Sequence, residues 1–545
     1  MFPLAGFEIR LAVTVVCRVP RCELYRPGGT VCEVNQPQPP VPAPSAAPLS
    51  AKRRWAALSV LVLAILLLAI DGTVLYLAVP ALTEALNPSA TQILWIGDIY
   101  SLALAGLLVV MGTLADRIGR KRLLLIGSGL FGAASLVAAF ATSAEMLMAA
   151  RLLLGVAGAT LMPSTLSLIR NIFPDPRERT RAIAIWSAAA GGGAALGPLV
   201  GGVLLQHFWW GSVFLINVPV VIILIVAGLF LLPESKDPHP GRFDLPSAVL
   251  ALASIVPLVY AVKHTVQSGV DVLGVACLLV GLGLGWLFVR RQHRLAAPMI
   301  DVDLFRNPAF SGAVISQFIA VFALTGLLFF FSQYLQLARG FSPLQAGLAE
   351  LPATLASIAV VILVGWFLGR LGAGRTIAVG LLLTALGLIA VAVAEGSESY
   401  LWLGLSLVPI GLGVGLAQTV TVDAVVTAVP QSKAGAASAI SETAYELGVA
   451  LGIAILGSLM TTLYRFNLPA DLSGEHGGAV RESLASALAV LDPGSPASSA
   501  AQHAFTSGMQ VTALVAAAVT LLGAVIAWRT IPSVKLVGKR PTADH

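Results

Sequence analysis

The feature that most constrains this chain is a series of long apolar segments. Fourteen of them can be recognised, each about long enough to cross the hydrocarbon core of a membrane as a helix. They lie near residues 56–80, 93–113, 122–141, 146–169, 182–205, 212–232, 245–263, 270–289, 311–336, 346–368, 376–394, 401–424, 435–460 and 509–529. A chain that is 57% hydrophobic and only 11% charged is also too apolar for a soluble domain. The sequence therefore predicts an all-α polytopic membrane protein with fourteen transmembrane helices.

Basic residues are concentrated in the connections on one side of these helices. That side carries Arg117, Arg120, Lys121, Arg122, Arg170, Arg177, Arg179, Arg181, Lys236, Arg242, Arg290, Arg291, Arg294, Arg306, Arg370, Arg375 and Lys433. The connections on the other side carry Lys263, Arg339, Arg465 and Arg481. Because basic loops stay in the cytoplasm, both termini are predicted to be cytoplasmic. The net charge of +6 follows from this bias and does not indicate nucleic-acid binding.

The four cysteines form neither a disulfide framework nor a metal-ligand pattern. Three of them lie in the first fifty residues, and Cys277 lies in a predicted helix. No metal or redox cofactor is therefore expected. Residues 1–54 lack a cleavable signal pattern and are predicted to form a disordered cytoplasmic tail. A start codon assigned upstream of the true one is the alternative explanation of this segment.

Two carboxylates are predicted in the outer half of the membrane. Asp71 lies in LLLAIDGTVLYLAVP of the first helix, and Asp98 lies in LWIGDIYSLALAG of the second. A charge at membrane depth costs at least ~2.5 kcal/mol, so such residues should face protein or water and serve function. Together they would attract cations. The alternatives are a permanently neutral Asp71 that only joins two helices, and a solvated Asp98 at the interface, where Glu350 and Asp423 are also expected.

The strongest charge signal is the pair Glu442 and Glu446 in ISETAYELGVALG of the thirteenth helix. Four residues apart, they share one helix face, ~10 to 17 Å from a cytoplasmic start near Gly435. Two like charges in a low dielectric cannot comfortably ionise together, so at least one carboxylate is expected to exchange its proton near neutral pH. When ionised it can neutralise a lipophilic cation, and proton and cation then compete for one site. The alternative is a hydrogen-bonded acid pair that fastens two helices.

The fifth helix is crowded with glycine. Gly193, Gly197 and Gly201 recur every four residues, so they form one row along which a neighbouring backbone can approach closely. Pro198 removes a backbone donor, and lipid offers no substitute partner for the freed carbonyl. The segment is therefore predicted to be buried among other helices. The alternative is that the same glycine pattern forms a general contact between small residues, of the kind found in any membrane helix bundle.

A charged turn follows the second helix in GTLADRIGRKR, residues 112–122. Opposite charges there can hold neighbouring helix ends in one conformation and release them in another. Residues 365–375, GWFLGRLGAGR, align with this turn without gaps and have Gly369 where the first copy has Asp116. The internal repeat predicts two six-helix bundles with an extra helix pair between them. The alternative interpretation of residues 112–122 is an ordinary basic loop on the cytoplasmic side of the membrane.

Several of these segments resemble one transporter family, the major facilitators. Their signature turn is matched by Gly112, Asp116, Arg117, Gly119, Arg120 and Lys121, and their antiporter motif by Gly193 to Gly202. The first helix resembles the fourteen-helix drug:proton antiporter-2 family through Asp71, Thr73, Val74, Ala78 and Pro80, with Tyr76 in place of the usual Asn. Arg151 with Gly155 resembles the fourth-helix motif of the family, and an arginine that only reaches out to the outer membrane interface is the alternative. LWIGDIYSL and the spacing of Glu442 and Glu446 resemble the quaternary-ammonium and viologen exporters.

The resemblance implies a major facilitator fold that works by alternating access. It implies a multi-pass, monomeric protein of a bacterial cytoplasmic membrane that exports lipophilic, often cationic drugs such as quaternary ammonium compounds, dyes and biguanides in exchange for protons. Its partners would be these small molecules, protons and the lipid bilayer. Its energy source would be the proton gradient, with no cofactor.

The resemblance and the charge pattern together assign roles to residues. Proton coupling is expected of Glu442, Glu446, Asp71 and Arg151. Substrate binding is expected of Asp71, Asp98, Glu442, Glu446 and Tyr76, the last through a ring that can meet a cation. Conformational change is expected to depend on Gly112, Asp116, Arg117, Gly119 and Arg120 in the charged turn, and on Gly193, Gly197, Pro198 and Gly201 in the fifth helix.

The predicted organisation has two bundles. A tail at residues 1–54 precedes the first bundle at 55–235, and two linker helices with a cytoplasmic linker occupy 236–306. The second bundle spans 307–531, includes an external loop at 464–508, and is followed by a tail at 532–545. Within that loop VRESLASALAVL can form a short amphipathic helix, although a plain linker is expected.

Other functions require features that the sequence lacks. An enzyme would need a nucleophile with a base, or clustered histidine and cysteine ligands, and all seven histidines lie in loops, tails or helix edges. No GxxxxGK[ST] loop appears, so ATP is not the expected energy source. A transport-dead sensor would tolerate loss of the embedded acids. An exporter of a specific metabolite or siderophore is the main alternative, because specificity depends on cavity shape.

Overall fold

The computed structural model describes residues 50–236, 244–295, 298–397, 399–430, 434–469 and 477–533. Within these ranges every regular element is helical and none is a strand. The predicted tails lie almost wholly outside the described residues. The first half contains α1 (Ala51–Leu86), α2 (Ala90–Ile118), α3 (Arg120–Ala139), α4 (Ala144–Ile172), α5 (Pro176–His207), α6 (Ser212–Leu215) and α7 (Asn217–Leu231). The linker pair is α8 (Leu245–Ser268) and α9 (Val272–Gln292).

The second half begins with the short turn η1 (Val302–Arg306). It continues with α10 (Pro308–Gln333), η2 (Tyr334–Ala338), α11 (Pro343–Ala349), α12 (Leu351–Val360), η3 (Val361–Leu363), α13 (Val364–Leu371), α14 (Ala373–Ala394), α15 (Tyr400–Thr427), α16 (Ala434–Asn467), α17 (Gly477–Glu482), α18 (Leu484–Val490) and α19 (Pro496–Thr530). Helices dominate because a backbone in lipid must satisfy its own hydrogen bonds.

The number of spans agrees with the sequence pattern. Among the described residues, thirteen helices or helix runs are long and apolar enough to cross a membrane, and α5 makes a fourteenth if its two arms are one span. The arms Arg177–Ala194 and Leu196–His207 meet at 41°. Pro198 lies just beyond this bend, as expected where a helix loses one of its own hydrogen bonds. We call the side of the turn between α2 and α3 the inner side, following the charge bias.

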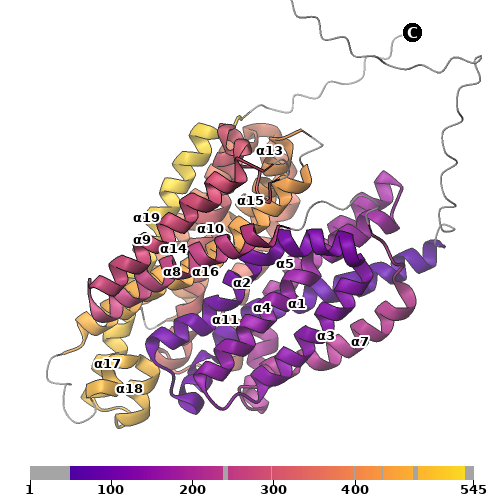
Figure 1. Ribbon diagram of the computed structural model, residues 1–545. Coiled ribbons are helices and arrows are strands. Elements are labelled where there is room, and N and C mark those ends of the chain that lie inside the picture. Colours follow the sequence, from indigo (N-terminus) through magenta and orange to yellow (C-terminus); the bar gives the residue numbers. More distant parts are fainter. Residues whose placement is uncertain are drawn as a thin grey trace, which may run out of the picture. The chain divides into compact units, whose positions relative to one another are not determined.

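The first half packs around one apolar cluster and the second around two, one of which also contains Tyr76, Val79, Ile93 and Leu94 of the first half. The backbone preserves the internal repeat. α3 lies beside α4 and α7 in the first half, and α14 lies beside α15 and α19 in the second (Figure 1). Gly119 separates α2 from α3 with φ 114°, and Gly372 separates α13 from α14 with φ 75°. These two glycines occupy equivalent positions in the repeat, and both adopt a backbone conformation that favours glycine.

The two halves contact each other through their outer ends. A Cβ on Gly97 of α2 would lie 2.8 Å from Phe329 of α10 and 3.2 Å from Ile453 of α16. A Cβ on Gly347 of α11 would lie 2.4 Å from the carbonyl oxygen of Pro198 in α5. Small residues thus allow the halves to approach closely on the outer side.

The linker helix α8 covers the line of contact between α2 and α16, which we call the seam. Figure 1 shows α8 running beside α16. Val259 of α8 belongs to one buried cluster with Leu102 of α2 and with Ala450 and Ala454 of α16. The linker helix α8 is therefore in direct contact with both halves.

The outer loop is more ordered than expected from the sequence. α16 continues to Asn467 and α19 starts at Pro496, so the connection is shorter than residues 464–508. The expected plain linker is wrong, because α17 and α18 lie within it. Ser483 caps α18 and separates it from α17, and Leu484 and Ala487 are buried.

Candidate functional site

The glycine row of α5 packs directly on α1. Cβ atoms added to Gly193, Gly197 and Gly201 would lie 2.7, 1.9 and 2.9 Å from the side chains of Ala69, Thr73 and Val74. The predicted burial of this row among other helices is thus observed. The Thr73 hydroxyl also donates a hydrogen bond to the carbonyl oxygen of Ala194, at 3.2 Å. This is the carbonyl four residues before Pro198, so the neighbouring helix supplies the donor that the proline lacks.

Asp71 lies at the centre of a buried polar network in the first half. Its Oδ2 is 3.1 Å from Nη1 of Arg151, and its Oδ1 accepts a hydrogen bond of 2.7 Å from Nδ2 of Asn217. Asn217 also donates to Ser135, and the Arg151 guanidinium lies 4.5 Å from the ring centre of Tyr100. The Asp71 and Arg151 side chains are 0% and 1% exposed. The network joins α1, α4, α3 and α7, and within it the Arg151 guanidinium balances the negative charge of Asp71.

Asp98 also has an internal cation, Lys263. Its Oδ2 lies 2.7 Å from the Lys263 Nζ, and the two side chains are 0% and 1% exposed. The expectation that Lys263 lies in an outer connection is wrong, because α8 continues five residues past it to Ser268. The ammonium also lies 3.8 Å from the ring centre of Trp95. Whether Asp98 binds substrate stays a prediction.

Glu442 and Glu446 share one face of α16, as the spacing predicts, and they have no such cation. Glu446 is buried and lies within hydrogen-bonding reach of Ser101 on α2, whereas Glu442 is half-buried. Tyr76, Tyr100 and Tyr445 are near enough to Glu446 for electrostatic interaction. Among the described residues, no lysine or arginine forms an ion pair with either glutamate. A proton or a bound cation can supply the positive charge that the chain does not.

Three other residues singled out in the sequence, Tyr76, Glu350 and Asp423, occupy distinct surroundings. The ring of Tyr76 packs edge-on against Phe329 of the second half, with 5.7 Å between centroids. Glu350 was expected at the interface, and this is wrong: it is 8% exposed, between α11 and α12, and its Oε1 has no hydrogen-bond partner among the described residues. Asp423 is exposed near the end of α15, as expected.

The charged turn makes its observed contacts inside the first half. Arg120 lies 2.8 Å from Asp116 and donates a hydrogen bond to the hydroxyl of Ser235 after α7. The backbone N–H of Lys121 donates to Glu234. The role of these residues in conformational change stays a prediction.

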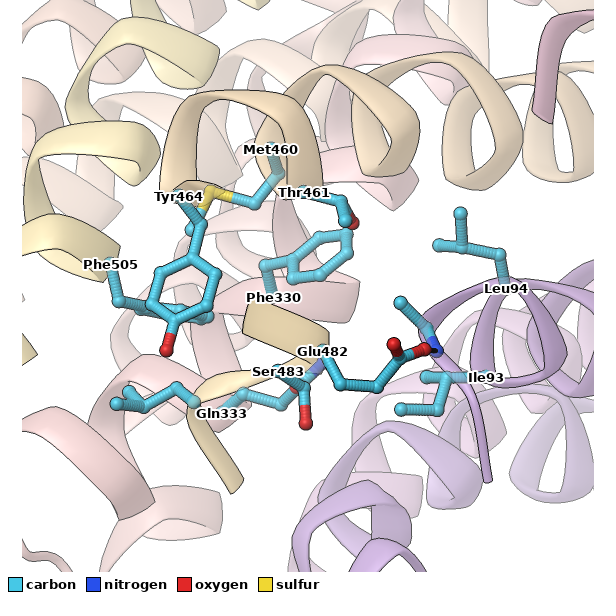
Figure 2. Close-up of a pocket in the computed structure, with 12 residues that line it drawn as sticks. Ile93, Leu94, Phe330, Gln333, Met460, Thr461, Tyr464, Glu482, Ser483 and Phe505 are labelled. Atoms are coloured by element: carbon cyan, nitrogen blue, oxygen red, sulfur yellow. Dashed lines mark hydrogen bonds between the residues drawn. The ribbon is translucent and has the colours of Figure 1, made fainter. Parts of the chain in front are cut away.

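A small pocket lies at the outer end of the seam. Its volume is about 30 Å³, too small for a drug-sized molecule. Figure 2 shows Phe330, Tyr464 and Phe505 on one side of it. Glu482 of the outer loop points toward the start of α2 near Ile93 in the same view.

Sequence reasoning missed Lys263, Trp95, Asn217 and Ser101. Asn217 was detectable as the polar residue in an otherwise apolar stretch, WWGSVFLINVP. A lysine near the end of a predicted span normally reaches the interface, so Lys263 gave no signal of burial. Trp95 and Ser101 could be recognised only after their neighbours on α8 and α16 were known.

Comparison with known proteins gives one consistent result. A family described as Major Facilitator Superfamily matches residues 61–453. The multidrug efflux pump LfrA of Mycolicibacterium smegmatis is 48% identical over 482 residues, which cover 87% of this chain and 95% of that protein. The methyl viologen resistance protein SmvA of Salmonella typhimurium is 37% identical over 484 residues, covering 87% and 98%.

More distant proteins extend the comparison. The tetracenomycin C resistance and export protein of Streptomyces glaucescens is 32% identical and covers 87% of this chain and 91% of its own length. The crystal structure of a bacterial homolog of the human lysosomal transporter Spinster, inward-facing and unoccupied, has a TM-score of 0.63 and 18% identity. It covers 88% of this chain and 98% of that one, which shows the fold.

Proposed function

Because this chain belongs to the Major Facilitator Superfamily, we propose that it exports lipophilic organic cations across the bacterial cytoplasmic membrane in exchange for protons. It is a multi-pass membrane protein whose relatives are transporters rather than enzymes. Support for the substrate class comes from relatives named for multidrug efflux and viologen resistance. The proton as driving ion is supported by buried carboxylates in the helices that join the two halves.

The observation that carries the proposal is that some acids in the helices form an ion pair with a lysine or arginine of the chain and others do not. Asp71 and Asp98 each have a cation from the chain itself. Glu442 and Glu446 have none among the described residues, although they lie where α16 meets α2. A proton or a lipophilic cation can supply the missing charge, and a site that accepts either one but not both performs exchange.

The arrangement of the halves fits loading from the inner side. The outer ends are in contact, and the pocket there is too small for a drug. In our proposal a cation from the inner side displaces the proton at Glu442 or Glu446. The halves then separate at the outer ends, and protons from outside replace the cation.

The test uses proteoliposomes with an imposed pH gradient and ethidium as the transported cation. The Glu442→Gln and Glu446→Gln double variant is expected to lose gradient-driven ethidium movement by at least tenfold. Asp423→Asn, which changes an exposed acid, is the matched control and should transport normally. Equal transport by the double variant would refute the assigned proton site.

A second candidate function is export of one specific natural product. The specific observation in its favour is the relative named for tetracenomycin C export. If wild-type protein moves no organic cation under the gradient, this candidate replaces the first, and tetracenomycin C becomes the first compound to test.

A further inference from the structure

Lys263 is held by two groups that together recognise an organic ammonium ion. A carboxylate, Asp98, lies 2.7 Å from its Nζ, and an indole, Trp95, lies 3.8 Å from it at the ring centre. An anion beside an aromatic face is a common binding arrangement for cations in proteins. Trp95 and Asp98 lie about one helical turn apart on α2, so they form a preformed unit of the first half.

The ion pair is poorly suited to a purely structural role. Apart from their 2.7 Å contact with each other, the Asp98 oxygens and the Lys263 Nζ have no hydrogen bond with the side chain of another described residue. A buried ion pair repays its desolvation only when further hydrogen bonds satisfy both groups. This pair therefore leaves buried polar atoms that another ligand could satisfy.

The pair lies next to the part of the structure that must move. Gly97, between Trp95 and Asp98, faces Phe329 and Ile453 of the second half. Val259, one turn before Lys263, touches α2 and α16 together. When those helices separate, α8 can follow only one of them, and if it follows α16 the ammonium moves away from Asp98 on α2.

We propose that Trp95 and Asp98 form a binding site for a monovalent lipophilic cation, and that the Lys263 ammonium occupies this site while the outer ends are closed. Separation of α2 and α16 withdraws the ammonium, and the transported cation takes its place on the way out. When the outer ends close again, the ammonium returns and displaces that cation. Lys263 is thus a tethered competitor of the substrate. The inference rests on the proposed function and adds an outer site to it.

The test measures binding of tetraphenylphosphonium to the purified full-length protein by calorimetry. Lys263→Met keeps the length of the side chain and removes the competing charge. It should lower the Kd at least tenfold, and adding Asp98→Asn should reverse that gain. Lys263→Arg keeps the charge and should bind as wild type does. Equal Kd values for Lys263→Met and for the double variant would overturn the proposal.

A second variant keeps the test decisive if Lys263→Met does not fold. Lys263→Gln also removes the competing charge and keeps a polar head group that can donate to Asp98, so it too should lower the Kd. An unchanged Kd for a folded Lys263→Gln protein would also overturn the proposal. The pH-gradient transport assay distinguishes failure of the outer site from failure of the proposed function. Wild-type protein that moves ethidium while these variants bind normally refutes only the outer site, whereas wild-type protein that moves no cation refutes the proposed function.

Discussion

Glu482 joins the two halves on the outer side. From the end of α17, its Oε1 accepts a hydrogen bond of 2.5 Å from the backbone N–H of Ala90, the first residue of α2. Its other oxygen is 3.9 Å from Arg465. Figure 2 shows the side chain directed from the outer loop toward α2. This contact exists only while the outer ends are together, so Glu482→Gln should favour the outward-open state.

The size of the effect follows from the geometry. A carboxylate at a helix N-terminus contributes about 0.3–1 kcal/mol, and a hydrogen bond to a charged group about 1.5–3 kcal/mol. Because the Glu482 side chain is 32% exposed, and a neutral amide can still accept the bond, we expect a loss near 1 kcal/mol. That value corresponds to an increase of about fivefold in the outward-open to outward-closed ratio.

The assay is labelling by a membrane-impermeant maleimide from outside. Ile453→Cys, in a background without other cysteines, places the reporter at a position that is fully buried against Gly97. Glu482→Gln should raise its labelling rate about fivefold. Asp492→Asn changes an exposed acid in the same loop and should leave the rate unaltered. If a folded Glu482→Gln protein labels at the wild-type rate, the contact does not stabilise the closed outer side.

Three further predictions concern single positions. Asp71→Asn leaves Arg151 buried without its anion, at a cost of about 3–5 kcal/mol, so the melting temperature should fall, and adding Arg151→Met should restore most of it. Gly197→Ala places a Cβ 1.9 Å from a hydroxyl of α1 and should cost about 1–3 kcal/mol in thermal unfolding, whereas Gly191→Ala, which would meet no neighbour, should cost little. Burial raises the pKa of Glu395, just beyond α14, well above its usual range. A raised folded-state pKa means that stability falls as pH rises, so Glu395→Gln should raise the melting temperature at pH 8 and change it little at pH 4.

The sequence predicts well those features that lipid imposes locally. Fourteen apolar segments and the glycine row of α5 follow from the needs of a backbone without water, and the structure has both. The face shared by Glu442 and Glu446 follows from helical spacing alone. These features depend on residues close together in the chain.

Features that depend on packing between distant segments were not predictable. Lys263 and Asp98 are 165 residues apart in sequence, and only the position of α8 over the seam brings them together. Glu350 looked interfacial because it lies early in its span. The structure buries it at the junction where α11 ends and α12 begins. Neither outcome has a local sequence signal.

The hydroxyl of Thr73 gives α5 an unusual mechanical property. It lies 3.2 Å from the carbonyl oxygens of both Ala69 in its own helix and Ala194 in α5. The hydroxyl can therefore donate to either helix without losing its bond. Pro198 has already removed the α5 hydrogen bond that a bend at this level would break. This position is a hinge at which a change of bend breaks none of the backbone hydrogen bonds within α5, and it lies in the helix that contacts the other half.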